Sequence, residues 1–143
     1  MLQRTIREVI AQQKASVASL DMTVRDAVRL MVKENCGSIM VERDGKLVGI
    51  FTESDALIRV LADGRNADST RLHEVMTRNP VFVHPDKPLV DALHMMRQFG
   101  FRHVPVVEDG RPVGVVSVSD ALATELRQIE NESMQPEGVN SAL

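Results

Sequence analysis

The sequence contains no tryptophan, no tyrosine and only four phenylalanines among its 143 residues. Proteins that bind single-stranded nucleic acid stack bases on aromatic rings and hold the phosphate backbone with basic side chains. This chain has few such rings, and its formal net charge is −3 at pH 7. We therefore expect no nucleic-acid partner.

The sequence is also poor in cysteine and in long apolar runs. Its single cysteine, Cys36, cannot form a disulfide within the chain, so nothing indicates an oxidising compartment. No apolar run approaches the roughly 18 residues of a membrane-spanning helix, and residues 1–13 lack the apolar core of a signal peptide. The sequence therefore predicts a soluble, cytoplasmic protein without a membrane partner.

Motifs of common catalytic and metal sites are missing as well. The sequence has no G-x-x-x-x-G-K-[ST] loop and no G-x-G-x-x-G, which excludes the usual NTPase and Rossmann patterns. Its four histidines lie 9 to 11 residues apart, and no histidine or cysteine has the spacing of zinc ligands. We therefore expect no metal and no catalytic residues.

What the chain does contain is an internal repeat. A shift of 65 residues aligns Asp21–Leu57 with Asp86–Leu122 without a gap, and 13 of the 37 aligned pairs are identical. The identical positions include an Asp-Gly pair in the middle of each copy and the sequence Ser-Asp-Ala-Leu at its end. The chain is therefore a duplication of one structural unit.

Each copy has the same order of hydrophobic patterns. In the first copy, apolar residues recur at helical spacing over residues 24–32, and strand patterns at Ser38–Val41 and Lys46–Thr52 flank the Asp-Gly turn. A second helical pattern covers residues 53–62, and Val81–Val83 predicts a short strand before the second copy. The fold class is therefore α+β, with two α-β-β-α repeats. A unit of this size has difficulty covering its own sheet, so we expect the two sheets to pack together with pseudo-twofold symmetry.

The repeat also sets the expected domain boundaries. Residues 1–64 hold an N-terminal segment and the first repeat, and residues 65–126 hold the second repeat. Beyond them the sequence turns polar, and Pro136 and Gly138 interrupt any periodicity. We expect residues 127–143 to form a flexible tail.

These patterns resemble the CBS domain, the module named after cystathionine β-synthase. The resemblance rests on Arg102–Val107 and on the segments that close the two copies, Gly49–Asp55 and Gly114–Asp120; Met76–Pro80 resembles the start of a CBS repeat. The likeness covers about residues 5–126. It implies a tandem CBS pair that acts as a regulatory module, is often paired again into a homodimer, and has up to two clefts for adenosyl ligands and no catalytic residues.

The resemblance assigns candidate residues to two clefts. The first cleft, beside Asp120, would use Ser117, Ser119, Arg102 and His103, with Cys36 and Gly37 as a wall for adenine. The second, beside Asp55, would use Thr52, Ser54, Ser38, Thr77 and Val81. Because Arg102 and His103 replace a glycine and a serine of the first copy, we expect two unequal sites, with stronger phosphate donors beside Asp120. With so few aromatic rings, adenine would lie between aliphatic side chains such as Val81, Ile39 or Val104.

The same residues also have structural interpretations. Thr52 with Asp55, and Ser117 with Asp120, have the spacing of a helix-capping pair. A carboxylate at a helix start can also accept the two hydroxyls of a ribose, so both roles stay open. The Lys14–Ser16 segment departs from the threonine-containing pattern at Met76–Pro80, which leaves the base pocket beside Asp120 less well defined.

Three classes of function are compatible with these observations. The first is a sensor of adenine nucleotides, with AMP as the first choice, ADP, ATP or NAD(H) as alternatives, and a signal passed to a regulated protein partner by a change of conformation or dimer. The second is a dimerisation scaffold that binds no ligand. The third, an enzyme, would require a catalytic partner chain, because no nucleophile or cofactor loop is recognisable.

Overall fold

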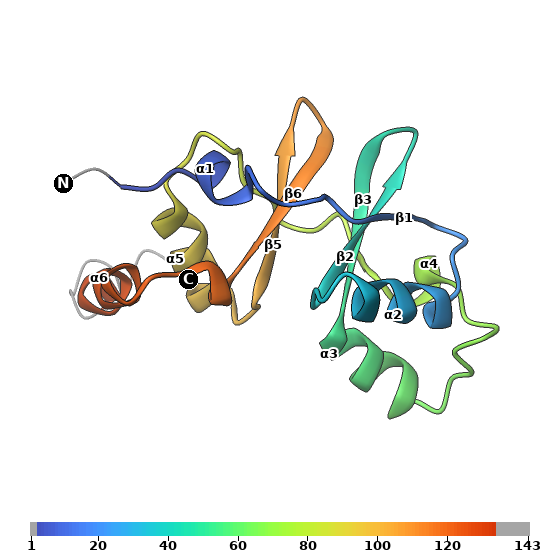
Figure 1. Ribbon diagram of the computed structural model, residues 1–143. Helices are drawn as coiled ribbons and strands as arrows, with labels where there is room; N and C mark the ends of the chain where they lie inside the picture. Colours follow the sequence, from blue (N-terminus) through green and yellow to red (C-terminus); the bar gives the residue numbers. More distant parts are fainter. Residues whose placement is uncertain (1–2, 134–143) are drawn as a thin grey trace.

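The computed structural model describes residues 3–133. Two β-hairpins stand side by side, and each has helices on its outer flank (Figure 1). The first half contains α1 (Ile6–Ile10), β1 (Val17–Ser19), α2 (Val24–Lys33), β2 (Ser38–Arg43), β3 (Lys46–Thr52), α3 (Glu53–Asp55) and the π-helix η1 (Ala56–Leu61). The second half contains α4 (Leu72–Val75), β4 (Thr77–Arg78), α5 (Leu89–Phe99), β5 (His103–Glu108), β6 (Arg111–Ser117), the 3₁₀-helix η2 (Val118–Asp120) and α6 (Ala123–Ser133).

The helix and hairpin predicted for the first repeat are confirmed. Helix α2 begins after Thr23, whose side chain accepts a hydrogen bond of 3.1 Å from the backbone N–H of Asp26. In the turn between β2 and β3, Asp44 and Gly45 have φ angles of 53° and 79°. Two positive φ angles give a turn whose twist matches that of the flanking strands, which explains the Asp-Gly pair. The closing helix also forms, but it widens into the π-helix η1 after its first turn.

The closing helix of the second repeat begins later than the repeat predicts. After η2, Ala121 adopts an extended backbone with a ψ angle of 141°. The Asp120 carbonyl accepts a 2.8 Å hydrogen bond from Arg4 Nη2 instead of a helical N–H. The Leu122 N–H donates to Glu125 Oε1 at 2.8 Å, which satisfies a donor at the start of a new helix. These two bonds separate η2 from α6.

Helix α6 also corrects the expectation for the C-terminal tail. The sequence predicts a flexible tail from residue 127, but residues 127–133 continue α6. Ile129 is only 5% exposed because it packs into the core of the second repeat, and this contact explains why the helix extends through a polar stretch. Residues 134–143 of the expected tail lie outside the described residues.

The strands form two sheets of different size. The first sheet has the order β1-β2-β3-β4, with β1 parallel to β2 and the other pairs antiparallel, and the second contains β5 and β6. The prediction of a strand at Val81–Val83 is wrong, because only Val83 pairs, in a single parallel bridge to Val106. Pro85 follows two residues later and has no N–H with which to extend the pairing.

The hydrophobic cores do not follow the sequence repeats. The core of the first repeat takes in Leu72, Val75 and Met76, which precede the second repeat. The core of the second repeat takes in Ile6 and Ile10 of α1, which precede the first repeat. Each repeat is therefore completed by the short helix that leads into the other repeat. The boundary expected at residues 64 and 65 separates the sequence copies, but it does not separate the cores.

Two strand glycines allow this exchange of helices. A Cβ atom at Gly114 would lie 3.0 Å from both the Cβ and the Cγ2 atoms of Ile10, and a Cβ atom at Gly49 would meet the sulfur of Met76. Gly49 and Gly114 are equivalent positions of the two repeats, and Ile10 and Met76 hold matching positions in the segments that lead into them. Both glycines are therefore packing positions, at which a side chain would displace the segment that leads into a repeat.

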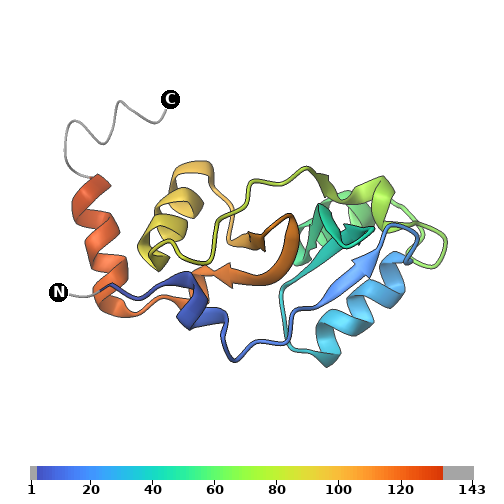
Figure 2. The same cartoon turned by 90° about the horizontal axis from the view of Figure 1, so that it is seen from above.

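The two sheets face each other, as the sequence predicts. Along β2 the side chains alternate, so that Ile39 and Val41 enter the first core, whereas Met40 points the opposite way and is nevertheless fully buried. Leu47 N donates a 3.3 Å hydrogen bond to Gly110 O and joins the two hairpins near their tips. Figure 2 shows the chain between α1 and β1 passing from the second repeat to the first.

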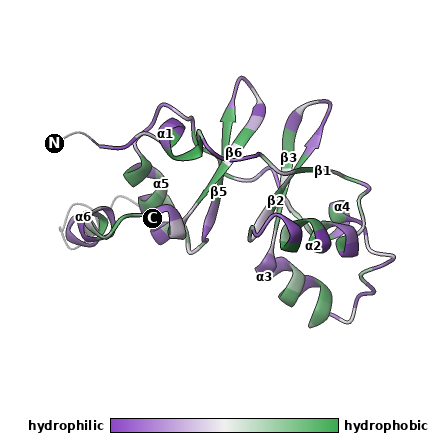
Figure 3. Ribbon diagram, in the orientation of Figure 1, coloured by the Kyte–Doolittle hydropathy of each residue, from purple (hydrophilic) through white to green (hydrophobic). Residues whose placement is uncertain are grey.

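Apolar residues concentrate on the facing hairpins, whereas α2 carries a hydrophobic and a hydrophilic face (Figure 3). This is the distribution expected of an amphipathic helix that covers one side of a sheet. Among residues 3–133, no helix combines the length and the apolarity needed to cross a bilayer.

Candidate functional site

A cleft of about 810 Å³ opens between the two repeats. One wall comes from the second half of α2 and the segment that leads to β2. The opposite wall comes from the start of β5, the end of β6 and η2, and the chain between α1 and β1 closes one side. The lining consists of Gln13–Ser16, Val28, Met31, Val32, Glu34–Ser38, Glu53, Ala56, Arg102, His103, Val115 and Ser117–Asp120.

This cleft brings together every residue that the sequence assigns to the site beside Asp120. They come from both repeats and are Cys36, Gly37, Arg102, His103, Ser117, Ser119 and Asp120. Ser38, which the sequence assigns to the other site, also lines this cleft. Their role in binding a ligand stays a prediction.

Asp120 is held at the start of η2 with one carboxylate oxygen engaged. Its Oδ2 accepts a 2.7 Å hydrogen bond from the backbone N–H of Ser117. Within residues 3–133, Oδ1 has no hydrogen-bond donor. The hydroxyls of Ser117 and Ser119 lie 2.6 Å apart beside it. One end of the cleft therefore offers an anionic acceptor next to two hydroxyl groups.

Arg4 of the N-terminal segment holds the backbone around Asp120 in place. Besides its bond to the Asp120 carbonyl, Arg4 forms a bidentate pair with Glu125, through Nε at 3.1 Å and Nη2 at 2.7 Å. The hydrogen bond from Arg4 lowers the pKa of the Glu125 carboxyl group, which is 8% exposed, and keeps it ionised. A partly buried ion pair thus anchors the backbone that carries the Asp120 carboxylate.

Charges of both signs lie beside Asp120 and the two hydroxyls, because His103 pairs with Ser117 across the β5–β6 ladder. Arg102 and His103 come from the second repeat, and Glu53 comes from the start of α3 in the first. A Cβ atom at Gly37 would lie 2.9 Å from His103 Nε2 and 3.2 Å from Glu53 Oε1, so a larger residue there would have to displace the ends of these two side chains. Burial lowers the pKa of His103 below its usual 6.5, Arg102 lowers it further, and the carboxylates of Glu53 and Asp120 oppose the shift. The imidazole is therefore uncharged at neutral pH.

Asp55, the counterpart of Asp120, is engaged at both oxygens. Oδ2 accepts a 2.9 Å hydrogen bond from Thr52 N, and Thr52 Oγ1 accepts one of 3.3 Å from Asp55 N, which confirms the predicted capping pair. Oδ1 lies 3.5 Å from Arg59 Nε. The residue of the second repeat that corresponds to Arg59 is Thr124, which carries no charge. The two aspartates are therefore in different electrostatic environments.

The remaining residues predicted for the Asp55 site do not line the 810 Å³ cleft. These are Thr52, Ser54, Thr77 and Val81. In this half of the molecule Phe101 corresponds to Cys36, and its ring stacks on Phe99 with the centroids 5.9 Å apart. A phenylalanine that stacks on a second ring thus stands at the position where the cleft beside Asp120 has Cys36.

The aliphatic side chains that were expected to contact adenine do not line the cleft. Ile39 and Val104 are fully buried in the two cores, and Val81 lies outside the cleft. The aliphatic lining consists instead of Val28, Met31, Val32 and Val115. Strand periodicity shows that alternate residues share a face, but it does not show which face borders a cleft.

The segment before β1 contributes a contact that the sequence does not reveal. The side-chain amide of Gln13 donates to Val115 O at 2.8 Å and accepts from Val115 N at 3.2 Å, as a neighbouring strand would. This pairing holds Lys14–Ser16 along the cleft. Glu53 was likewise not predicted; the repeat offers a weak signal, since a charged residue stands there opposite Val118 of the second copy.

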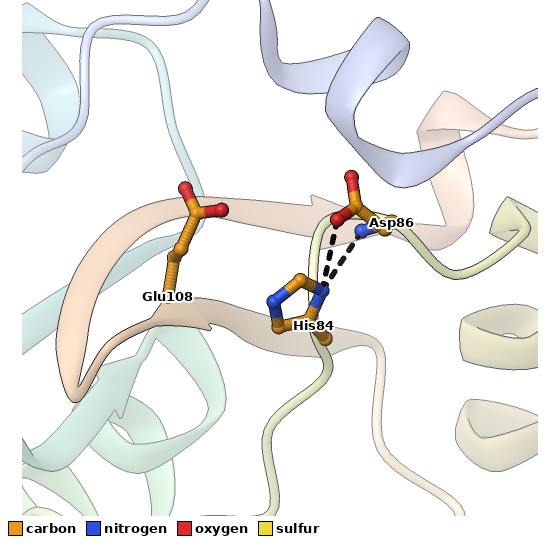
Figure 4. A group of neighbouring side chains, drawn as sticks. All are labelled: His84, Asp86 and Glu108. Atoms are coloured by element: carbon orange, nitrogen blue, oxygen red, sulfur yellow. Dashed lines mark hydrogen bonds and ion pairs between the residues drawn. The ribbon is translucent and has the colours of Figure 1, made fainter.

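His84, Asp86 and Glu108 lie together on the surface of the second repeat (Figure 4). One nitrogen or oxygen atom from each lies within 4.8 Å of the others, an arrangement that histidine spacing alone does not predict. Arg7 already binds both carboxylates, at 2.9 Å to Asp86 and 2.6 Å to Glu108, and its hydrogen bonds lower the pKa of both groups. We interpret the cluster as an ion-pair network that holds α1 on the second repeat.

Comparison with known proteins gives consistent matches for the whole fold. The model of the CBS domain family matches residues 6–62 and 72–126. The CBS domain-containing protein YhcV of Bacillus subtilis is 33% identical over 129 residues, which cover 90% of this chain and 89% of YhcV. CBSCBSPB2 of Arabidopsis thaliana is 32% identical over 142 residues, 99% of this chain but 26% of that protein. The chain thus spans about a quarter of the length of this Arabidopsis relative.

Among solved structures, the CBS domain pair of protein MJ0100 is similar, with a TM-score of 0.75 and 26% identity. The match covers 90% of this chain and 99% of that one. That structure is a complex with 5′-methylthioadenosine and S-adenosyl-L-methionine.

Proposed function

Since the chain belongs to the CBS domain family, we propose that it is a non-catalytic regulatory module that binds an adenosyl ligand in the cleft beside Asp120. The ligand would join the two repeats, because the cleft is lined by both of them. A ligand shifts a conformational equilibrium only as far as it binds one state better than the other. Ligand binding would change the angle or spacing of the two repeats, and a protein partner would bind one arrangement better than the other.

One observation carries this proposal. The 810 Å³ cleft places a carboxylate with a free oxygen at one end and Arg102 with His103 nearby. Its volume lies within the usual range for small-molecule sites. Asp120 would accept the ribose hydroxyls, Arg102 and His103 would face a phosphate, and adenine would lie against Val115 and the aliphatic face of α2.

The adenosyl ligands of MJ0100 support the ligand class. Within that class we propose AMP as the first ligand, because Arg102 offers a bidentate donor for one phosphate. ADP, ATP and NAD(H) are the alternatives. Because both oxygens of the Asp55 carboxylate already have partners, we propose a single ligand per chain. The site beside Asp55 would then have a mainly structural role.

Thermal unfolding of nucleotide-free protein tests the proposal. We expect the Tm to rise with AMP and other adenosyl compounds and to stay constant with GMP as the control. A ligand at about 100 times its Kd adds roughly 2.7 kcal/mol to the free energy of unfolding, which raises the Tm of a domain of this size by several degrees. The panel would contain AMP, ADP, ATP, NAD, NADH, S-adenosylmethionine and GMP. A constant Tm with every compound would instead favour a ligand-free scaffold.

We also propose that the module forms a homodimer through the outer surface of its first repeat. Val32 of α2 and Leu57, Ile58 and Leu61 around η1 are 61–75% exposed, although all are large and apolar. α2 and η1 both pack on the first core, and we propose that these exposed side chains form one patch next to the cleft, which Val32 also lines. Exposed apolar patches of this kind mark interaction sites.

Light scattering during gel filtration measures the oligomeric state. We expect the wild-type protein to have about twice the chain mass of 15.9 kDa and Leu61→Asp to raise the dimer dissociation constant about tenfold, since a charge is costly to bury in an apolar contact. Phe82→Asp is the matched control, because Phe82 is 50% exposed and lies outside this patch. A monomeric wild-type protein would contradict the proposal.

A further inference from the structure

The charges that line the cleft do not suit a polyanion. Lys14 Nζ lies 3.7 Å from Glu34 Oε1, so these two charges largely compensate each other. Arg102 is the remaining cation, and Glu53 and Asp120 are the remaining anions. Asp120 faces the ribose in the proposed function, which leaves Arg102 and Glu53 to determine the charge that the rest of the ligand meets.

Glu53 lies where it can influence a phosphate. Its Oε1 atom and His103 Nε2 lie 3.2 Å and 2.9 Å from the point that a Cβ atom at Gly37 would occupy, so the carboxylate lies close to His103, one of the two proposed phosphate donors of the other repeat. The Glu53 side chain is exposed, and it makes no hydrogen bond or ion pair with other residues in the described part of the chain, whereas the Glu53 backbone N–H donates to Gly37 O at 3.0 Å. In the second repeat the corresponding residue is Val118, so the fold itself does not require an acid there.

We propose that Glu53 is a specificity-determining residue, which makes this cleft accept adenosyl ligands with at most one phosphate and discriminate against triphosphates. This inference rests on the proposed function. A single phosphate can be balanced by Arg102, but a triphosphate brings about two further negative charges. These would meet the Glu53 carboxylate without a second cation to compensate them. A cationic 5′ group would be favoured by the same carboxylate.

Titration calorimetry with wild-type protein and Glu53→Gln tests this, in buffer without magnesium. We expect the wild-type protein to bind AMP about tenfold more tightly than ATP. In Glu53→Gln the affinity for ATP should rise about tenfold, whereas the affinity for uncharged adenosine should stay within twofold. S-adenosylmethionine carries a sulfonium beside the 5′ carbon, so its affinity should fall about threefold. A purely structural role of Glu53 would not change the affinities in opposite directions.

Two further variants complete the design. Glu8→Gln removes one negative charge on α1, outside the cleft, and should leave all four affinities unchanged. Arg102→Ala should weaken AMP and ATP about tenfold and leave adenosine unchanged. If adenosine binds but the ratio of ATP to AMP affinity is the same with and without Glu53, the inference is wrong and the proposed function stands. If no adenosyl compound binds, both are wrong.

Discussion

Replacement of Asp120 by asparagine should weaken the binding of adenosine and AMP about 100-fold while the protein stays folded. The asparagine amide oxygen can still accept the hydrogen bond from Ser117 N, so the η2 turn is retained. The ribose hydroxyls, however, lose a charged acceptor. Hydrogen bonds to charged groups contribute about 1.5–3 kcal/mol and neutral ones about 1 kcal/mol, so two weakened bonds cost roughly 2–3 kcal/mol.

Asp55→Asn is the matched control for this variant. Asp55 holds the same position in the first repeat, but Thr52 and Arg59 already engage its oxygens. We expect this substitution to lower the free energy of unfolding by about 1 kcal/mol, since it weakens a helix cap, and to leave the affinity for AMP unchanged. Calorimetry and thermal unfolding of both variants separate the two roles. Wild-type affinity in Asp120→Asn would contradict the ribose role.

The second large effect is expected where α1 packs on β6. Gly114→Ala should lower the free energy of unfolding by about 1–3 kcal/mol, because the new methyl group would lie 3.0 Å from Ile10 Cβ. That Cβ is attached directly to the α1 backbone and cannot rotate away. The gain of about 0.5 kcal/mol that alanine brings by restricting the unfolded chain does not offset this clash.

A double-mutant cycle identifies the cause. Ile10→Ala alone should cost about 2–4 kcal/mol, because Ile10 fills the core of the second repeat. It also removes Ile10 Cγ2 and Cδ1, which would lie 3.0 Å and 3.1 Å from the methyl group at residue 114, and so relieves part of the clash while Cβ stays in place. The double variant should therefore lose about 1–2 kcal/mol less than the sum of the single variants, as measured by urea unfolding. Additive losses would show that α1 does not pack against Gly114.

The local features were predictable because their causes are local. The Asp-Gly turns follow from the backbone freedom that two positive φ angles demand, and Thr52 with Asp55 forms the capping pair that its spacing indicates. The residues of the Asp120 site were also predicted, by analogy with CBS domains rather than from spacing. Their grouping in one cleft follows from the packing of two similar repeats around a pseudo-twofold axis.

Other features depend on contacts between distant parts of the chain. The late start of α6 depends on Arg4, which is 116 residues from the Asp120 carbonyl that it binds. The length of α6 depends on Ile129 reaching the second core, which no local pattern in a polar segment indicates. The strand predicted at Val81–Val83 reduces to one bridge, because strand pairing depends on the partner strand as well as on propensity.

The sequence by itself determined the duplication, the α+β class and the hairpins, because each follows from the repeat or from a short-range pattern. Only the tertiary structure decided which leading helix completes which core, that Asp55 is engaged by Arg59, and that Glu53 faces His103 across Gly37. These are relations between segments that are brought together by packing. Two repeats with similar sequences can therefore carry different electrostatic environments.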